Sequence, residues 1–412
     1  MSLRTIHVLR KFDRAEWGGT ETALQRLFEG LRENEVEAVI YGPQLTHAPE
    51  KEASQIRRFH SFVPILGLSQ ERRRQMVSVG GNLMSFDLAS LLWKERDAAV
   101  IHTHTLGRLG GIARLVAKFR HIPFVVSIHG GVLDLPEKVR QDFNAPIRGG
   151  WEWGRIFGWL LGSRLLFRDA DCILTCNEKE AALLREGCPG KRVVVQPHGV
   201  PLDLYQQDCR PHARSAFPQM SGRQMLLGVG RIDPIKNQAW LLDQAPAIFQ
   251  KHPNALLVLA GPCTNEAYGE LVRRKIQELG LRENVLLTGG LPPNDPRLIG
   301  LMQEANALLL PSLSETFGLV ILEAWAAGTV VVSSRASGPS ALIRDGENGW
   351  LFSLDQSGPF HEAVDRALTD PALARRMARR GASISQQYSI AALAARLKNL
   401  YEELIREKQC AL

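Results

Sequence analysis

The alternation of short apolar runs with longer amphipathic segments is the feature that most limits how this 412-residue chain can fold. The short runs are aliphatic and β-branched at nearly every position, which is typical of parallel strands that helices cover on both faces. The pattern begins twice, so the sequence predicts an α/β protein with two doubly wound domains. The predicted strands are 5–9, 37–41, 98–102, 124–128, 172–175, 193–196, 225–228, 255–260, 285–288, 307–310 and 330–334.

The domain boundary is predicted at residue 200, which gives a first domain of residues 1–200 and a second of residues 201–388. Residues 197–222 are rich in Pro, Gly, Asp and Gln and lack a clear period, so we interpret them as a linker. An amphipathic helix is predicted at 390–407. Open α/β sheets bind ligands beyond the carboxyl ends of their strands, so two such domains facing each other would form one cleft.

Composition narrows the classes of function. Fifty basic and 43 acidic residues give a net charge of +7. An excess this modest and dispersed suits phosphorylated ligands or an anionic membrane surface and argues against nucleic acid. No uncharged apolar run approaches ~18 residues, and the N-terminus lacks the features of a signal peptide. Six cysteines without C-x-x-C spacing fit a reducing compartment, so we expect a cytoplasmic protein without a disulfide framework.

The densest cluster of candidate residues lies around Glu315 and Glu323. A helix predicted to begin near Gly318 is apolar almost all round, so Glu323 within it is a core carboxylate that needs a partner. The free N–H groups around Phe317, Gly318 and Leu319 form an anion site at the start of that helix. A sugar nucleotide, with hydroxyls at both ends and a diphosphate between them, fits this layout. The alternative is a core salt bridge at Glu323 and an exposed loop residue at Glu315.

A second cluster follows the first predicted strand of the second half. Gly230 permits close backbone approach, and Arg231 and Lys236 are spaced to bind a diphosphate from the strand end and the next helix start. The alternative is that both cations are merely solvated. As a dinucleotide fingerprint the segment fails, because Asp233 stands where the third glycine of G-x-G-x-x-G belongs. An NAD-linked dehydrogenase is therefore disfavoured.

Three features of the first domain lie at predicted strand ends. Gly18 and Gly19 stand between a strand and a helix, where backbone N–H groups meet phosphates or a reacting sugar. The alternative is a glycine turn with Thr20 as helix N-cap. His129 follows another strand end, which makes it a candidate to hydrogen-bond a substrate.

His102 and His104 also lie at a strand end, with their two imidazoles able to face one way. No carboxylate follows them to complete a metal site. We therefore predict that the chain has no bound metal and no cofactor.

These motifs, in their order along the chain, resemble those of the retaining glycosyltransferases of family 4, which have the two-domain GT-B fold. The likeness covers nearly the whole chain, and its most specific part runs from Glu315 to Glu323, which matches the family's E-x7-E motif. The other matching segments are Gly18-Gly19, His129-Gly130, 195–200, Gly230-Arg231, Lys236, Pro311-Ser312 and 346–349.

The resemblance implies two Rossmann-like domains facing each other across a cleft, with the last helix crossing back to the first domain. We therefore assign residues 389–412 to the first domain. It also implies an enzyme that moves a hexose-type sugar from a nucleoside-diphosphate sugar to a hydroxyl acceptor, without a metal and with retention of configuration. The acceptor would be a sugar or a lipid-linked molecule, and the expected location is the cytoplasm, with a peripheral position at the inner face of the membrane if the acceptor is lipid-linked.

Site roles follow from the same resemblance. Glu315 would bind hydroxyls of the donor sugar and Glu323 the ribose. Arg231 and Lys236 would bind the diphosphate, with help from Gly230 and from the backbone of Phe317, Gly318 and Leu319. Gly19 would contribute from the first domain, and His129 would lie beside the transferred sugar.

Three positions depart from the family pattern. The usual Asn-Gly-Val-Asp turn reads His198-Gly199-Val200-Pro201, Asn237 replaces a glycine, and Ala341 replaces a frequent glutamate. None removes a diphosphate contact, but the donor stays open. A non-catalytic sugar-nucleotide-binding protein, an epimerase of the same fold and a transferase acting on a soluble disaccharide or small molecule are the alternatives.

Two segments predict contact with an anionic membrane. Residues 149–168 interleave Trp, Phe and Leu with Arg155, Arg164 and Arg168, and the apolar stretch 59–68 precedes three arginines at 72–74. Aromatic and aliphatic side chains beside arginines suit a lipid surface. The alternative is a core helix and a solvated charged face. The membrane interpretation favours a lipid-linked acceptor, as in the synthesis of a bacterial surface polysaccharide or glycolipid.

Overall fold

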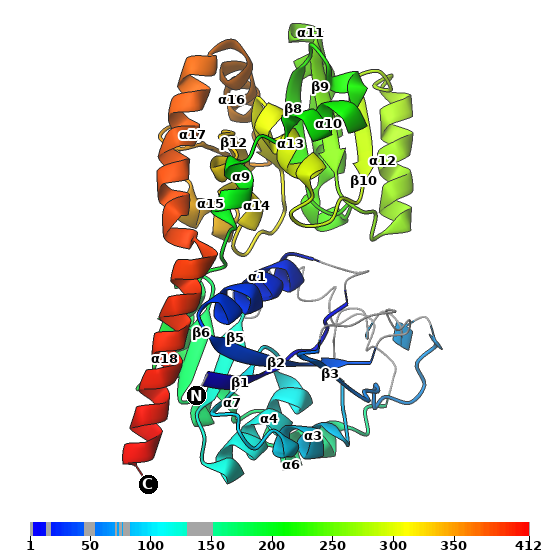
Figure 1. Cartoon of the computed structure of the whole chain (residues 1–412). Coiled ribbons are helices and arrows are strands. Elements are labelled where there is room, and N and C mark those ends of the chain that lie inside the picture. The colour runs from blue at the N-terminus through cyan, green and yellow to red at the C-terminus, as the bar shows by residue number, and fades with distance from the viewer. Residues whose placement is uncertain are drawn as a thin grey trace. The chain divides into compact units, whose positions relative to one another are not determined.

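The structure is a computed structural model that describes residues 3–13, 18–44, 54–70, 72, 73, 76, 83–129 and 151–411. It divides into two compact units (Figure 1). Unit 1 comprises residues 1–198 and 391–412, and unit 2 comprises residues 199–390. Each unit is built on its own parallel sheet, which confirms the predicted α/β class with two doubly wound domains.

Unit 1 carries a seven-stranded sheet in its described residues, in the order β3-β2-β1-β4-β5-β6-β7. Every pairing in it is parallel. The order reverses between β1 and β4, so the loops after these two strands leave toward opposite faces. In chain order the strands are β1 (Leu3–Val8), β2 (Val36–Pro43), β3 (Ile56–Phe59), β4 (Val100–Thr103), β5 (Phe124–Ile128), β6 (Cys172–Thr175) and β7 (Val193–Val195).

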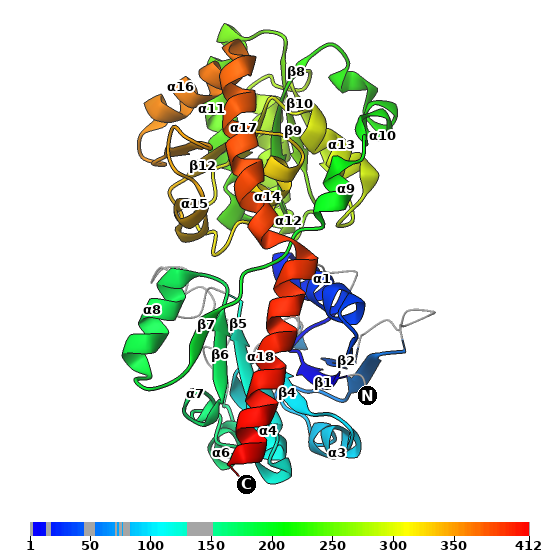
Figure 2. The same ribbon diagram turned by 60° about the vertical axis from the view of Figure 1, so that its left-hand side comes forward.

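Helices cover both faces of this sheet, as Figures 1 and 2 show. Apolar side chains of α1 and α18 pack on one face, and those of α3, α4 and α7 pack on the other. The described helices are α1 (Gly19–Glu33), α3 (Leu88–Lys94), α4 (Gly107–Arg120), α6 (Arg155–Leu160), α7 (Leu166–Asp169), α8 (Glu178–Gly187) and α18 (Ile390–Cys410).

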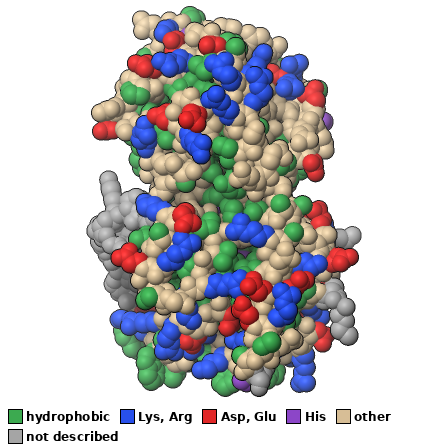
Figure 3. Space-filling model, turned by 90° about the vertical axis from the view of Figure 1, so that its left-hand side faces the viewer, with side chains coloured by type: hydrophobic (Ala, Val, Ile, Leu, Met, Phe, Trp, Pro, Cys, Tyr) green, Lys and Arg blue, Asp and Glu red, His purple; other side chains and the backbone are tan. Residues whose placement is uncertain are grey.

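The C-terminal helix α18 belongs to unit 1 from Ala391 onward and lies along its sheet (Figure 2). Leu397 and Tyr401 are fully buried among residues of this core that include Phe28. At the rim, Arg192 donates to Glu403 over 2.6 Å. Figure 3 shows basic and acidic side chains interspersed over the surface of each unit. The apolar stripe of the helix therefore completes the core, while its charged side chains stay at the surface.

Unit 2 has a six-stranded sheet in the order β10-β9-β8-β11-β12-β13, again parallel throughout. Its strands are β8 (Gln224–Val229), β9 (Ala255–Ala260), β10 (Val285–Gly289), β11 (Ala307–Leu310), β12 (Val331–Ser334) and β13 (Trp350–Phe352). Its α-helices are α9 (Leu202–Gln206), α10 (Arg210–Ala216), α11 (Gln238–Lys251), α12 (Glu266–Glu278), α13 (Pro296–Glu304), α14 (Leu319–Ala326), α15 (Ser337–Leu342), α16 (Ser357–Thr369) and α17 (Pro371–Ser385). Three 3₁₀ turns are η3 (Pro218–Met220), η4 (Pro234–Lys236) and η5 (Gln386–Tyr388).

The prediction of a linker at 197–222 is wrong. This segment forms α9, α10 and η3, and its Tyr205, Ala213 and Met220 are buried in unit 2. Helices of five and seven residues span too few turns to show a hydrophobic period, and the prolines that begin two of these elements resemble loop signals.

The sequence prediction also missed two edge strands, β3 and β13. Strand β3 reads Ile-Arg-Arg-Phe, so charged residues interrupt its apolar pattern, as is common at a sheet edge. Strand β13 has only three residues, fewer than the pattern needs to be recognised. Among the described residues, no helix combines the length and apolar character that crossing a membrane requires.

Candidate active site

Eight of the ten predicted site residues lie in unit 2, in the loops that follow β8 and β11 or in α14. These two strands are neighbours, and the strand order reverses between them. Such a switch point leaves the carboxyl ends of two strands uncovered, because the two following helices pack on opposite faces. The topology therefore brings together two loops that are 79 residues apart in the chain.

Lys236 and Glu315 form the closest contact between these loops. Lys236 ends η4, whose first turn is held by Asp233, the side chain of which accepts a hydrogen bond from the backbone N–H of Ile235. From there the Lys236 Nζ donates to Glu315 Oε2 over 2.5 Å, and both side chains are only partly exposed. A pair with this geometry is screened less than one at the open surface.

Backbone hydrogen bonds fix the loop that carries Glu315. The N–H of Leu313 donates to the carbonyl of Ile235 over 2.8 Å, and the N–H of Gly338 donates to the carbonyl of Glu315 over 2.7 Å. The Ser334 hydroxyl donates to the carbonyl of Ser312. The loops after β8, β11 and β12 are thus tied to one another, and Glu315 is held in place before any ligand binds.

Arg231, in the same loop as Lys236, is exposed, and its carbonyl accepts a hydrogen bond from Gln238. Gly230, which directly precedes Arg231, lies against Gly261, a residue that the sequence analysis did not single out. A Cβ atom on Gly261, after β9, would lie 2.1 Å from the Gly230 carbonyl oxygen. Only glycine permits this approach. The Gly-Pro step at 261–262, directly after a predicted strand, is the signal that could have identified it.

The anion site that the sequence predicts would lie at the start of α14. Gly318 is its N-cap, with a φ of 93° that favours glycine. Phe317 before it is buried, and Leu319 is the first helical residue. Glu323, one turn further along, is 9 % exposed, as predicted for a carboxylate on a buried helix. Free N–H groups at the helix start and a buried carboxylate therefore lie on one element.

In unit 1, Gly19 is the first residue of α1, and Gly18 is its N-cap. The Gly18 N–H donates to the Glu21 carboxylate over 3.0 Å, so the alternative of Thr20 as N-cap is wrong. A Cβ on Gly19 would meet nothing within 4 Å. Gly19 is therefore not required by packing in unit 1.

His129 follows β5 and lies in a row of histidines. Its Nε2 is 2.8 Å from His104 Nδ1, and its ring stacks on that of His198 with centroids 5.4 Å apart. Gly130, beside it, lies outside the described residues. His104 in turn bonds His7, whose other ring nitrogen is 3.0 Å from the Thr5 hydroxyl.

Three of these rings also show the spacing of a metal site, since His7, His102 and His104 offer nitrogens within 4.8 Å of one another. Each of their six ring nitrogens already has a protein partner. The His102 nitrogens lie 2.6 Å from the hydroxyls of Tyr401 and Ser127. A metal ion would have to replace these bonds, so the cluster fits a hydrogen-bonded network better than a metal centre.

Burial keeps these histidines neutral. It lowers the pKa of His7 to about 3 and that of His198 to about 4, with Arg26 adding to the effect at His198. The pKa values of His102, His104 and His129 are lowered well below the usual range, first by burial and then by the neighbouring histidines, with Arg10 adding to the effect at His129. Each ring therefore carries one N–H at neutral pH.

Two family models match the chain over adjoining halves. The model described as Glycosyltransferase Family 4 matches residues 17–204, and the one described as Glycosyl transferases group 1 matches residues 210–384. The chain belongs to the family 4 glycosyltransferases. The roles that the resemblance implies for Glu315, Glu323 and the other site residues stay predictions.

Curated relatives carry the name D-inositol 3-phosphate glycosyltransferase. The protein of Nocardia farcinica is 31% identical over 258 residues, which are 60% of this chain and 56% of the relative. That of Corynebacterium glutamicum is 25% identical over 83% of this chain and 80% of the relative. The chain thus matches little more than half the length of the first of these relatives.

A solved structure shows the same fold. Anabaena HepE in complex with UDP superimposes with a TM-score of 0.71 at 16% identity, over 98% of this chain and 100% of HepE. This likeness confirms the predicted GT-B fold for the family member described here.

We expect the free energy of unfolding to fall as the pH is lowered from 7 to 5.5. The buried histidines keep lowered pKa values in the folded protein and regain about 6.5 on unfolding, so the unfolded state binds more protons in this window. Each contributes up to the order of 1 kcal/mol per pH unit. Urea unfolding at several pH values measures the slope.

His198→Asn should make this slope shallower. His212→Asn is the control, because His212 is exposed in unit 2. Equal slopes in wild type and His198→Asn would contradict the prediction.

Proposed function

We propose that this protein transfers a hexose from a nucleoside-diphosphate sugar to a hydroxyl acceptor, with retention of configuration. The Lys236–Glu315 pair, fixed at a sheet switch point beside the exposed Arg231, is the observation that supports it most directly. Two cations and the start of α14 suit a diphosphate, and the partly exposed Glu315 carboxylate suits sugar hydroxyls.

In this proposal the cations act on the leaving group. Negative charge grows on the diphosphate as the bond to the sugar breaks, and Arg231 and Lys236 stabilise that charge. Glu315 keeps the Lys236 ammonium group in position and uses its second oxygen to bind the donor sugar. Glu323 binds the ribose from α14. His129, in unit 1, hydrogen-bonds the sugar that is transferred.

The comparisons support the class of donor. HepE is a structural neighbour that was solved with UDP, and the curated relatives are named as glycosyltransferases. The alternatives of a non-catalytic binding protein and an epimerase predict no transfer to an acceptor. Product analysis with and without acceptor distinguishes all three.

Glu315→Gln, Lys236→Ala and Arg231→Ala should each lower kcat/KM at least about tenfold, or ~1.4 kcal/mol of barrier. Each change removes a charge from the proposed diphosphate-sugar site. Lys251→Ala is the control. Lys251, at the end of α11, also pairs with a carboxylate of unit 2, that of Asp365, but lies outside the proposed site. Near wild-type rates in all three folded variants would refute the proposed site.

We also propose that no divalent metal takes part, because Arg231, Lys236 and the helix start already supply positive charge to the diphosphate. Transfer should therefore continue at an unchanged rate after dialysis against EDTA. Loss of activity that Mg²⁺ or Mn²⁺ restores would contradict this expectation.

The acceptor proposal rests on an apolar surface of unit 1. Nine of the twelve exposed large hydrophobic residues in the described chain lie in unit 1, and eight of them, all except Leu183 on α8, lie between residues 66 and 160, with Trp159 as the most exposed at 81%. Arg155 and Arg164 are exposed in the same segment. The eight are Leu66, Phe86, Trp93, Phe119, Trp151, Ile156, Trp159 and Leu160, and we call them the apolar face.

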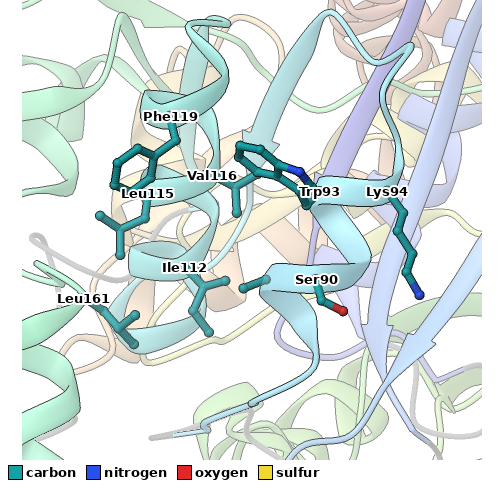
Figure 4. Close-up of a pocket in the computed structure, with 9 residues that line it drawn as sticks. Ser90, Trp93, Lys94, Ile112, Leu115, Val116, Phe119 and Leu161 are labelled. Carbon is teal, nitrogen blue, oxygen red and sulfur yellow. The ribbon is translucent and has the colours of Figure 1, made fainter.

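A groove between α3 and α4 extends this surface (Figure 4). It has a volume of about 530 Å³, and Ile112, Leu115 and Phe119 of α4 line it opposite Trp93 of α3. Exposed aromatic residues beside arginines suit the interface of an anionic bilayer. We therefore propose that unit 1 binds such a bilayer and that the acceptor is lipid-linked, as in surface polysaccharide or glycolipid synthesis.

The structure changes which arginines can serve this role. Arg73 donates to the carbonyls of Val63 and Ile65, so it holds a loop in place and is not a solvated charge. Arg74 lies outside the described residues. The test of membrane binding therefore uses Arg155 and Arg164.

Wild-type protein should co-sediment with anionic liposomes at low salt and less at high salt. Trp159→Ser should reduce binding because it removes an aromatic side chain that would enter the interface. The double variant Arg155→Ser/Arg164→Ser should reduce binding roughly thirtyfold, since each basic residue contributes about 1 kcal/mol near such a surface. Controls on unit 2 are Leu279→Ser and Arg375→Ser/Arg376→Ser, which alter exposed residues of the same kinds. Binding that ignores both lipid charge and these variants would contradict the proposal.

A small soluble acceptor is the second candidate. The observation that favours it is the name of the curated relatives, which specifies a phosphorylated inositol. Transfer assays with inositol 3-phosphate and with a lipid-linked acceptor, using one donor, separate the two.

A further inference from the structure

The histidine row in unit 1 is a hydrogen-bonded chain that runs from the interior of the sheet to its carboxyl edge. Thr5 and His7 are two residues apart on β1 and therefore share a face, as do His102 and His104 beside β4. His7 pairs directly with His102 across the two strands. Exposure rises along the chain, from 0% at Thr5 and His7 to 7% at His104.

Three contacts link the chain end to end. Thr5 Oγ1 lies 3.0 Å from His7 Nε2, His7 Nδ1 lies 2.9 Å from His104 Nε2, and His104 Nδ1 lies 2.8 Å from His129 Nε2. His129 Nε2 is thus engaged, which leaves Nδ1 as the nitrogen that a ligand can reach.

The direction of these hydrogen bonds decides whether His129 Nδ1 donates or accepts a hydrogen bond. A neutral imidazole has one N–H, so each ring that donates on one side must accept on the other. If the Thr5 hydroxyl donates, His7 and His104 donate onward, and His129 keeps its proton on Nδ1. If His129 donates instead, every bond reverses, and Nδ1 becomes an acceptor.

We propose that His104 is a positioning residue that, backed by His7 and Thr5, holds the His129 ring and selects which of its nitrogens carries the proton. This rests on the proposed function, in which His129 binds the transferred sugar. The chain orients rather than conducts, because it ends at Thr5, which is fully buried and has no exit to water. The lowered pKa values of these rings support a neutral chain.

Two amide substitutions separate positioning from packing. In His104→Asn the amide lies near the position of Nδ1 and keeps a partner for His129, whereas in His104→Gln it lies near Nε2 and keeps a partner for His7 only. We expect His104→Gln to lower kcat at least about tenfold and His104→Asn to stay within about threefold of wild type. The affinity for UDP, measured by calorimetry, should not change in either variant.

His102→Gln is the matched control. Its ring lies 4.0 Å from that of His104 between centroids, on the same strand end, but its nitrogens bond Tyr401 and Ser127 rather than the chain. Its kcat should stay near that of wild type. If kcat falls equally in His102→Gln and His104→Gln, or is equal in the two His104 variants, then His104 contributes only packing and the inference is wrong.

A measurement without substrate distinguishes failure of this inference from failure of the proposed function. Two-bond ¹H–¹⁵N spectra of histidine-labelled protein report which nitrogen carries the proton. We expect one tautomer at His129 in wild type and averaged signals in His104→Gln. Averaged signals in wild type, or an unchanged His129 in His104→Gln, would overturn the inference even if transfer is observed. So would stoichiometric Zn²⁺ binding to wild type that His104→Gln abolishes.

Discussion

Two loops in each sheet emerge at the point where the strand order reverses, and the function proposed for this protein depends on that constraint. In unit 2 the reversal lies between β8 and β11, and it places Lys236 against Glu315. In unit 1 it lies between β1 and β4, and it places His7 beside His102. Helices that pack on opposite faces leave these strand ends open, so polar side chains can gather there.

The two units use the reversal differently. Unit 2 gathers charge, with an ion pair, an exposed arginine and free N–H groups at the start of α14, which suits a ligand that brings its own negative charge. Unit 1 gathers neutral rings, because burial lowers the pKa values of its histidines far enough to keep them uncharged. A row of neutral imidazoles gives direction and orientation to a hydrogen bond without the cost of burying a charge.

Helix α18, near the C-terminus, contacts the histidine cluster of unit 1. Its Tyr401 is buried in the core with Leu397 and places a hydroxyl 2.6 Å from His102 Nδ1. The helix that completes the apolar core thus also satisfies a ring nitrogen of the histidine cluster. His102 is therefore held by the core, whereas His104, at the strand end, connects to His129.

The sequence by itself determined the α/β class, the two doubly wound sheets and the buried helix that carries Glu323, because apolar strands and a carboxylate on an apolar helix are local patterns. It did not reveal helices α9 and α10, strand β3 or the close approach of Gly261 to Gly230, since short elements carry too little periodicity and the Gly-Pro step at 261–262 does not show which residue the glycine approaches. Only the tertiary structure decided that Lys236 bonds Glu315, that Arg73 holds a loop, and that Thr5, His7, His104 and His129 form one chain. The Lys236–Glu315 contact and the histidine chain join residues up to 97 positions apart, and the order and register of the strands bring them together.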